Sequence, residues 1–123
     1  MSAVEYIAGT TLTTAAATVD FTGIPGNYTD LILTCAMGSS GATAGSYVRL
    51  NGDTGSNFSG TLLYGTGSAA GSNRQSNTVR AITTNRIPQN ALGSVVFQIM
   101  SYANTNVFKT WVTLGGDYSQ FVE

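Results

Sequence analysis

The feature that most constrains this chain is an alternation of apolar and polar residues, repeated in short stretches that turn-forming residues separate. The clearest stretch is 28–37, in which Leu31, Leu33, Cys35 and Met37 fall two residues apart. Residues two apart lie on the same face of a β-strand, so this set predicts a strand whose apolar face meets the core. Within this run we expect Cys35 to act as a small buried hydrophobic group.

Similar stretches recur along the chain, while Leu, Glu, Lys and Gln, which favour helix interiors, are scarce. Short strands at this spacing are typical of sandwiches and barrels. The sequence therefore predicts an all-β fold, an antiparallel, jelly-roll-like β-sandwich of about eight strands, which occupies residues 1–123 as a single domain. The predicted strands are 3–8, 16–21, 28–37, 45–51, 60–65, 78–83, 93–102 and 107–114.

Two later stretches differ in what their faces carry. Val95, Phe97 and Ile99 share one face, which predicts a buried side for their strand, with Gln98 turned outward. The stretch 107–114 instead carries large apolar groups on both faces. Such a strand is either covered on both sides or lies at an interface between subunits.

Turn chemistry separates these stretches. Residues 24–27 (Ile-Pro-Gly-Asn) and the pair Asn51-Gly52 are both strong turn formers. Two segments rich in small residues, 38–46 and 65–77, are predicted to be long loops that are mobile or become ordered by a partner.

Charge limits the kind of partner. Only 9% of the residues are charged, against about 25% in an ordinary soluble domain. The net charge is −1, so we expect no basic surface for phosphates and no nucleic-acid partner. A weakly charged surface repels its own copies little and favours association. The sequence has no signal-peptide pattern and no apolar run that would span a membrane, so we expect synthesis in the cytoplasm and no membrane partner.

The chain contains no histidine and one cysteine, which limits its chemistry. These counts exclude a histidine-based triad, a His-rich metal site and a Cys-only zinc site within one chain. A single cysteine also excludes an internal disulfide. We therefore expect no enzyme activity, no cofactor and no metal.

Carboxylates leave one enzymatic alternative open. Asp53-Thr54-Gly55 matches the short signature of aspartic proteases, in which two carboxylates share one proton. In this sequence the triplet follows the turn at Asn51-Gly52, whereas a protease motif follows a hydrophobic strand. We therefore interpret the triplet as a polar turn in which the Asp side chain caps nearby amides.

Two ligand-binding patterns are incomplete. Oxygen-bearing residues at 51, 53 and 57 alternate as in a calcium loop, but the twelfth position is Leu62, where an EF-hand needs Glu. A weaker structural ion stays an alternative. Glycines at 65, 67 and 71 resemble a phosphate-binding loop, yet no Lys and no helix follow, so we interpret them as part of a flexible surface loop.

Six residues are candidates for contacts with a partner or a ligand. Aromatic faces bind glycans and peptides, and arginines pair with carboxylates. The alternative for both kinds of residue is a role in packing, at strand ends or in contact with solvent. The candidates are Tyr47, Tyr64, Arg74, Arg80, Trp111 and Tyr118.

Two segments resemble a known group of proteins. They are 23–33 (GIPGNYTDLIL) and 49–59 (RLNGDTGSNFS). Together they resemble uncharacterised structural and fibre-like proteins of tailed phages, notably marine and cyanobacterial ones, over residues 4–111. The resemblance implies a β-sandwich in a virion and supplies no catalytic residues. Related chains continue for a strand or two past 109–111, which implies that this sandwich closes differently or that a neighbouring subunit supplies a strand.

These observations combine into one expected function. The chain is predicted to be a non-enzymatic phage virion structural protein on the particle exterior, a capsid decoration or fibre-like subunit that is assembled in the host cytoplasm. Its partners would be other virion proteins and its own copies, with a homotrimer favoured by virion symmetry. The alternative is a tail-fibre or receptor-binding module that recognises host-surface glycan or protein, and a third hypothesis is an Asp53-dependent dimeric protease.

Overall fold

The computed structural model describes residues 4–42 and 44–116, and these residues form strands and connecting segments. The predicted all-β class is confirmed, because this part of the chain contains no helix, and hence none that could cross a membrane. In chain order, the strands are β1 (Leu31–Met37), β2 (Ala44–Val48), β3 (Phe58–Gly65), β4 (Ala70–Thr78), β5 (Ala81–Ile87), β6 (Gly93–Met100) and β7 (Thr110–Gly116).

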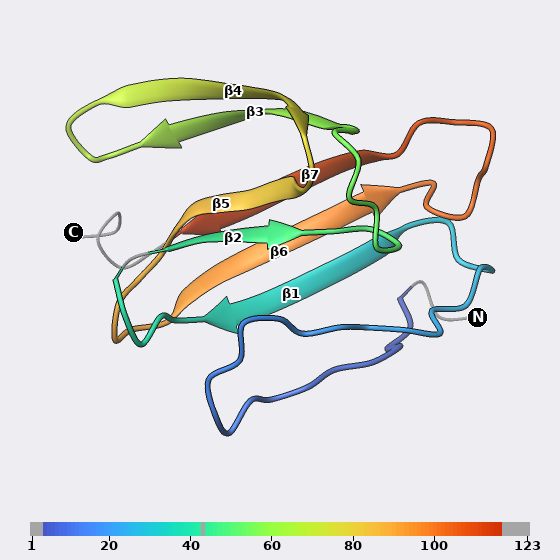
Figure 1. The fold of residues 1–123 in the computed structure, drawn as a ribbon, viewed down its shortest axis with the longest axis horizontal. Helices are drawn as coiled ribbons and strands as arrows, with labels where there is room; N and C mark the ends of the chain where they lie inside the picture. The colour runs from blue at the N-terminus through green and yellow to red at the C-terminus, as the bar shows by residue number, and fades with distance from the viewer. Residues whose placement is uncertain (1–3, 43, 117–123) are drawn as a thin grey trace.

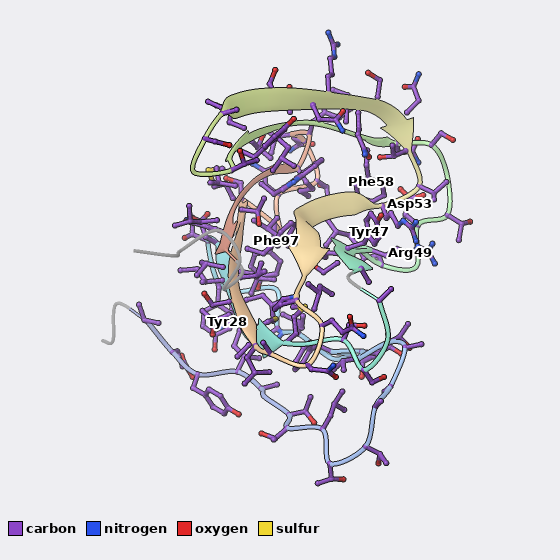
Figure 2. All side chains as sticks on the ribbon, turned by 90° about the vertical axis from the view of Figure 1, so that its left-hand side faces the viewer. Tyr28, Tyr47, Arg49, Asp53, Phe58 and Phe97 are labelled. Carbon is purple, nitrogen blue, oxygen red and sulfur yellow. The ribbon has the colours of Figure 1, made fainter. Side chains whose placement is uncertain are left out.

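The strands form three antiparallel sheets. β6 is the centre of a three-stranded sheet in the order β1-β6-β7, β2 pairs with β5, and β3 pairs with β4. Figure 1 shows the β2–β5 pair beside this larger sheet, and the β3–β4 hairpin projecting at one end of the molecule. Figure 2, turned by 90°, shows the same projecting hairpin. The predicted antiparallel pairing is therefore confirmed.

The core is small for a chain of this length. Its buried hydrophobic side chains are Phe58, Ala81, Val95, Phe97 and Ile99. Three of them alternate along β6, as the sequence pattern predicts, and Phe97 is only 1% exposed. The core thus joins β6 to the first residues of β3 and β5.

β1 shows the alternation that the sequence predicts. Leu31, Leu33, Cys35 and Met37 are half-buried, whereas the residues between them are exposed. Each residue of β1 faces one of β6, with Leu33 opposite Phe97 in the register. The apolar face of β1 therefore extends the face of β6 that carries the core.

Two predicted strands near the N-terminus are not formed. Residues 4–8 and 16–21 hold no strand, although their composition is that of strands. A strand needs a neighbour to complete its backbone hydrogen bonds, and no described strand pairs with either segment. Residues 4–20 are instead exposed throughout and make a wide loop below β1 in Figure 1. We call residues 4–20 the arm.

The segment predicted as a long loop at 65–77 is mostly β4. Its Gly, Ser and Asn residues have low strand propensity, but β4 pairs with β3 along nearly its whole length. A short turn at 66–69 reverses the chain, where the amide of Thr66 donates to the carbonyl of Ala69 at 2.8 Å. The ring of Tyr64 lies against Gly71 in the facing strand, which covers a glycine that would otherwise weaken the pair.

Polar contacts fix the start of β1 to the end of β6. Asp30, which precedes β1, accepts a hydrogen bond from the amide of Ser101 at 2.9 Å and one from Gln98 at 3.3 Å. The hydroxyl of Tyr102 donates to the carbonyl of Pro25 and accepts from the amide of Tyr28 at 3.4 Å. The predicted turn at 24–27 is thus held against the β6–β7 connection.

We expect Phe97→Ala to destabilise the fold by about 3–5 kcal/mol, because it removes a fully buried ring from a tightly packed core. Thermal or denaturant unfolding measures the change. Phe108→Ala is the matched control, since Phe108 is 100% exposed and its loss should leave the midpoint unchanged. An unaltered midpoint for Phe97→Ala would contradict the placement of the core.

Candidate functional site

The loop between β2 and β3 holds the carboxylate that the protease signature contains. Asn51 and Gly52 both have positive φ, at 51° and 66°, and the amide of Asp53 donates to the carbonyl of Leu50 at 2.9 Å. Positive φ at both central residues fits a type I′ turn, in which an Asn-Gly pair is the preferred sequence. Here the turn lies in the connection between β2 and β3, which do not pair with each other. The turn predicted at Asn51-Gly52 is confirmed.

The side chain of Asp53 folds back onto this loop. Its carboxylate accepts from the amide of Gly55 at 2.8 Å and from the side-chain amide of Asn57 at 2.9 and 3.1 Å. The bond from Asn57, then that from Gly55 and the charge of Arg49, hold the pKa of Asp53 below its usual range. The geometry is that of the amide cap predicted for this triplet.

These contacts do not fit the protease dyad or the calcium loop that the sequence pattern suggested for this segment. A protease dyad needs a carboxyl that shares a proton, whereas the hydrogen bonds around Asp53 favour its ionised form. Asn57, a member of the calcium-like pattern, points its amide nitrogen at the carboxylate. Among the described residues, no group of three His, Cys, Asp or Glu could hold a metal ion.

Two of the predicted contact residues meet on the β2–β5 side of the molecule. The guanidinium carbon of Arg80 lies 3.7 Å from the centre of the Tyr47 ring, which is a cation–π contact. Tyr47 is 45% exposed, so one side of the ring contacts the arginine and the rest remains accessible. Figure 2 labels Tyr47, Arg49 and Asp53 on the same side of the molecule.

Two other predicted residues lie on the β3–β4 hairpin, on opposite faces. Tyr64 pairs with Gly71, and Arg74 with Thr61, so the alternation places Tyr64 on one face and Arg74 on the other. Arg74 is exposed, and Leu63, on the same face as Arg74, is 77% exposed. The two predicted contacts are therefore not brought together.

Trp111 takes a packing position. Its ring stacks with Phe97 at 6.4 Å between centroids and 23° between planes, and meets Phe58 edge-on at 6.1 Å. The indole thus connects β7 to the core, and its role in an interface stays a prediction. Tyr118 lies outside the described residues.

The two most exposed apolar surfaces of the structure were not given a role from the sequence. The β1-β6-β7 sheet turns a second apolar face away from the core, which we call the outer face. Val112 and Leu114 lie on it with 57% and 76% of their surface exposed, beside Ile32 and Val96. The sequence did indicate such a surface, since 107–114 is apolar on both sides. The neighbouring strands that share this face could be identified only from the register of the sheet.

The arm is the other surface that the sequence reasoning missed. Val4 and Tyr6 are 79% and 81% exposed, and Leu12 is 51% exposed. Near the start of the arm, Glu5 accepts a hydrogen bond from Tyr28, and the pKa of Tyr28 is raised by partial burial and then by this carboxylate. The arm is therefore held to the body at this point, and the rest of it forms a loop that turns and comes back beneath β1 (Figure 1).

Comparison of the chain with protein-family models, curated proteins and solved structures found no match in any of the three. The exposed surfaces of the chain are therefore the basis for its proposed function.

We expect Asp53→Asn to flatten the dependence of stability on pH in the acidic range. A folded pKa below the unfolded value of about 3.9 stabilises the fold above that value, and the effect is lost as pH falls through the folded pKa. Melting temperatures between about pH 7 and pH 2 measure the slope. Thr54→Ser, an exposed change in the same loop that leaves the charge unaltered, is the control; a wild-type slope in Asp53→Asn would contradict the prediction.

Proposed function

We propose that this chain is a non-enzymatic structural subunit on the exterior of a phage virion, a capsid decoration or fibre-like subunit, that assembles with its own copies. The observation that carries the proposal is the amount of exposed surface. The chain exposes 9084 Å², whereas a folded monomer of 12.7 kDa exposes roughly 6,200 Å². Roughly 2,900 Å² more is therefore exposed than a monomer of this mass leaves in water.

That excess is the size of a permanent interface. Stable homomeric interfaces bury about 2,000–5,000 Å² in total, and they are rich in apolar side chains. The arm, the outer face and the hairpin supply such side chains, including Tyr6, Leu63 and Leu114. Covering them in an assembly would complete the layers of a jelly-roll-like sandwich that a single copy leaves open.

The virion location and the homotrimer follow from the resemblance to tailed-phage structural proteins and from the symmetry of phage particles. The low charge of the chain, 9% of its residues, supports close packing of copies because it leaves little repulsion between them. Other virion proteins would be the remaining partners, with assembly in the host cytoplasm before the subunit reaches the virion surface.

We expect the purified protein to have about three times the mass of one chain, as measured by light scattering after size exclusion. The physical reason is that the total surface left by one copy exceeds what a monomer of this mass exposes. A well-folded monomer at micromolar concentration would contradict the assembly and would favour a module that docks singly onto a larger particle.

One observation favours a receptor-binding module as a second candidate. The β3–β4 hairpin projects from the body in both views (Figures 1 and 2), and it carries Tyr64, which is 46% exposed. A projecting element with an accessible aromatic ring is suited to stacking on a sugar or a protein surface.

If this second candidate is correct, the wild-type protein binds a host-surface glycan on an array and Tyr64→Ala loses at least tenfold in affinity, as expected for removal of an anchoring ring. Tyr6→Ala, at a ring of the arm that is 81% exposed, is the control and should retain binding. The absence of binding to any host surface would rule the candidate out.

A further inference from the structure

The arm is a length of chain outside the sheets, held to the body at Glu5. All of residues 4–20 are exposed, and the backbone hydrogen bonds of the described residues include none from this segment. Val4, Tyr6 and Val19 expose large apolar surfaces along it. Unpaired backbone beside apolar side chains is available to add as a strand to the edge of another chain's sheet.

The β3–β4 hairpin has a free edge to which such a strand can add. It is a sheet of only two strands, and such a sheet is marginally stable in water unless a third strand or a packed layer supports it. β3 lies against β5, so the outer edge of the hairpin belongs to β4. The face that carries Leu63 and Arg74 is open to solvent.

The arm and the hairpin cannot meet within one copy. Both views place the hairpin at one end of the molecule and the arm at the opposite end, with the β1-β6-β7 sheet and the β2–β5 pair between them (Figures 1 and 2). The arm of one copy can therefore reach the hairpin of another only. Such a contact joins different surfaces of the two copies, and a head-to-tail contact of this kind closes into a ring when the rotation permits.

Charge and area agree with this pairing. The arm carries two acids, Glu5 and Asp20, and no base, while Arg74 is the charged residue of β4. In a ring each copy uses its arm once and its hairpin once, so the excess of roughly 2,900 Å² per chain equals the total area of one interface, within the range of permanent assemblies.

We propose that the arm of one copy adds as a third strand to the outer edge of β4 in the next copy, with Asp20 beside Arg74, and that this exchange closes the ring. The inference rests on the proposed self-assembly and names the segment that makes it. The occupant of the β4 edge is thus a second copy of this chain.

The experiment is a disulfide trap between two differently tagged full-length chains. Both carry Cys35→Ser, which removes the native thiol, and one also carries Thr18→Cys in the arm. The other carries Ser72→Cys or Ser76→Cys in β4, which lie on the face of Arg74 and opposite position 18 in a parallel or an antiparallel pairing with Asp20 beside Arg74. The chains are mixed under mild denaturant, reassembled and oxidised, and the gel is run without reductant. We expect a cross-linked pair that contains both tags.

The control replaces the β4 cysteine with Ser94→Cys, which puts an exposed thiol on the outer face of β6 and should give no mixed pair. If the protein assembles but the arm does not cross-link to β4 above the Ser94 control, the exchange is wrong while the proposed assembly stands. If the chains are monomers by light scattering, the assembly and the exchange both fail.

A charge exchange tests the same contact without thiols. Arg74→Glu and Asp20→Arg should each raise the dissociation constant of the assembly about fivefold, because a like-charge pair replaces a complementary one at an exposed site. The double variant should return to within about twofold of the wild type. Additive weakening in the double variant would show that these residues do not face each other and would overturn the proposed register.

Discussion

The fold depends on the contact of Phe97 with the ring of Trp111. Phe97 sits at the middle of β6, which is itself the central strand between β1 and β7, and Trp111 carries the contact from β7 to Phe58 at the start of β3. Ala81, at the start of β5, is fully buried in the same cluster. One group of side chains therefore joins all three sheets. Because that group is small, much of the apolar material of the chain remains outside it.

The alternation of apolar and polar residues predicted those strands whose faces depend on that alternation alone. A period of two is visible in the sequence of β1 and β6, and their faces follow from it, because each strand packs one side on the core. β4 was missed since its Gly, Ser and Asn residues give no such signal, and it is a strand only through its pairing with β3. The arm shows the converse, where a strand-like sequence has no described neighbour to pair with. Strand pairing is a property of two segments, which a single stretch of sequence does not contain.

At the candidate site too, some contacts could be predicted from the sequence and others could not. The cap by Asp53 could be predicted because Asn51-Gly52 and Gly55 lie next to it in the chain. The contact of Arg80 with Tyr47 could not, since it depends on how β2 meets β5. The opposite faces of Tyr64 and Arg74 likewise depend on the register of the hairpin. The two-sided composition of 107–114 was visible in the sequence, but the core contact of Trp111 and the exposure of Leu114 required the placement of β7.

Cys35 has a consequence for the proposed assembly of copies. The thiol is half-buried on the inner side of β1, and burial raises its pKa, so it remains protonated at neutral pH. Thiolate is the form that reacts with oxidants and disulfides. In the proposed assembly, Cys35 would therefore form disulfides between neighbouring copies less readily than an exposed thiol of ordinary pKa would.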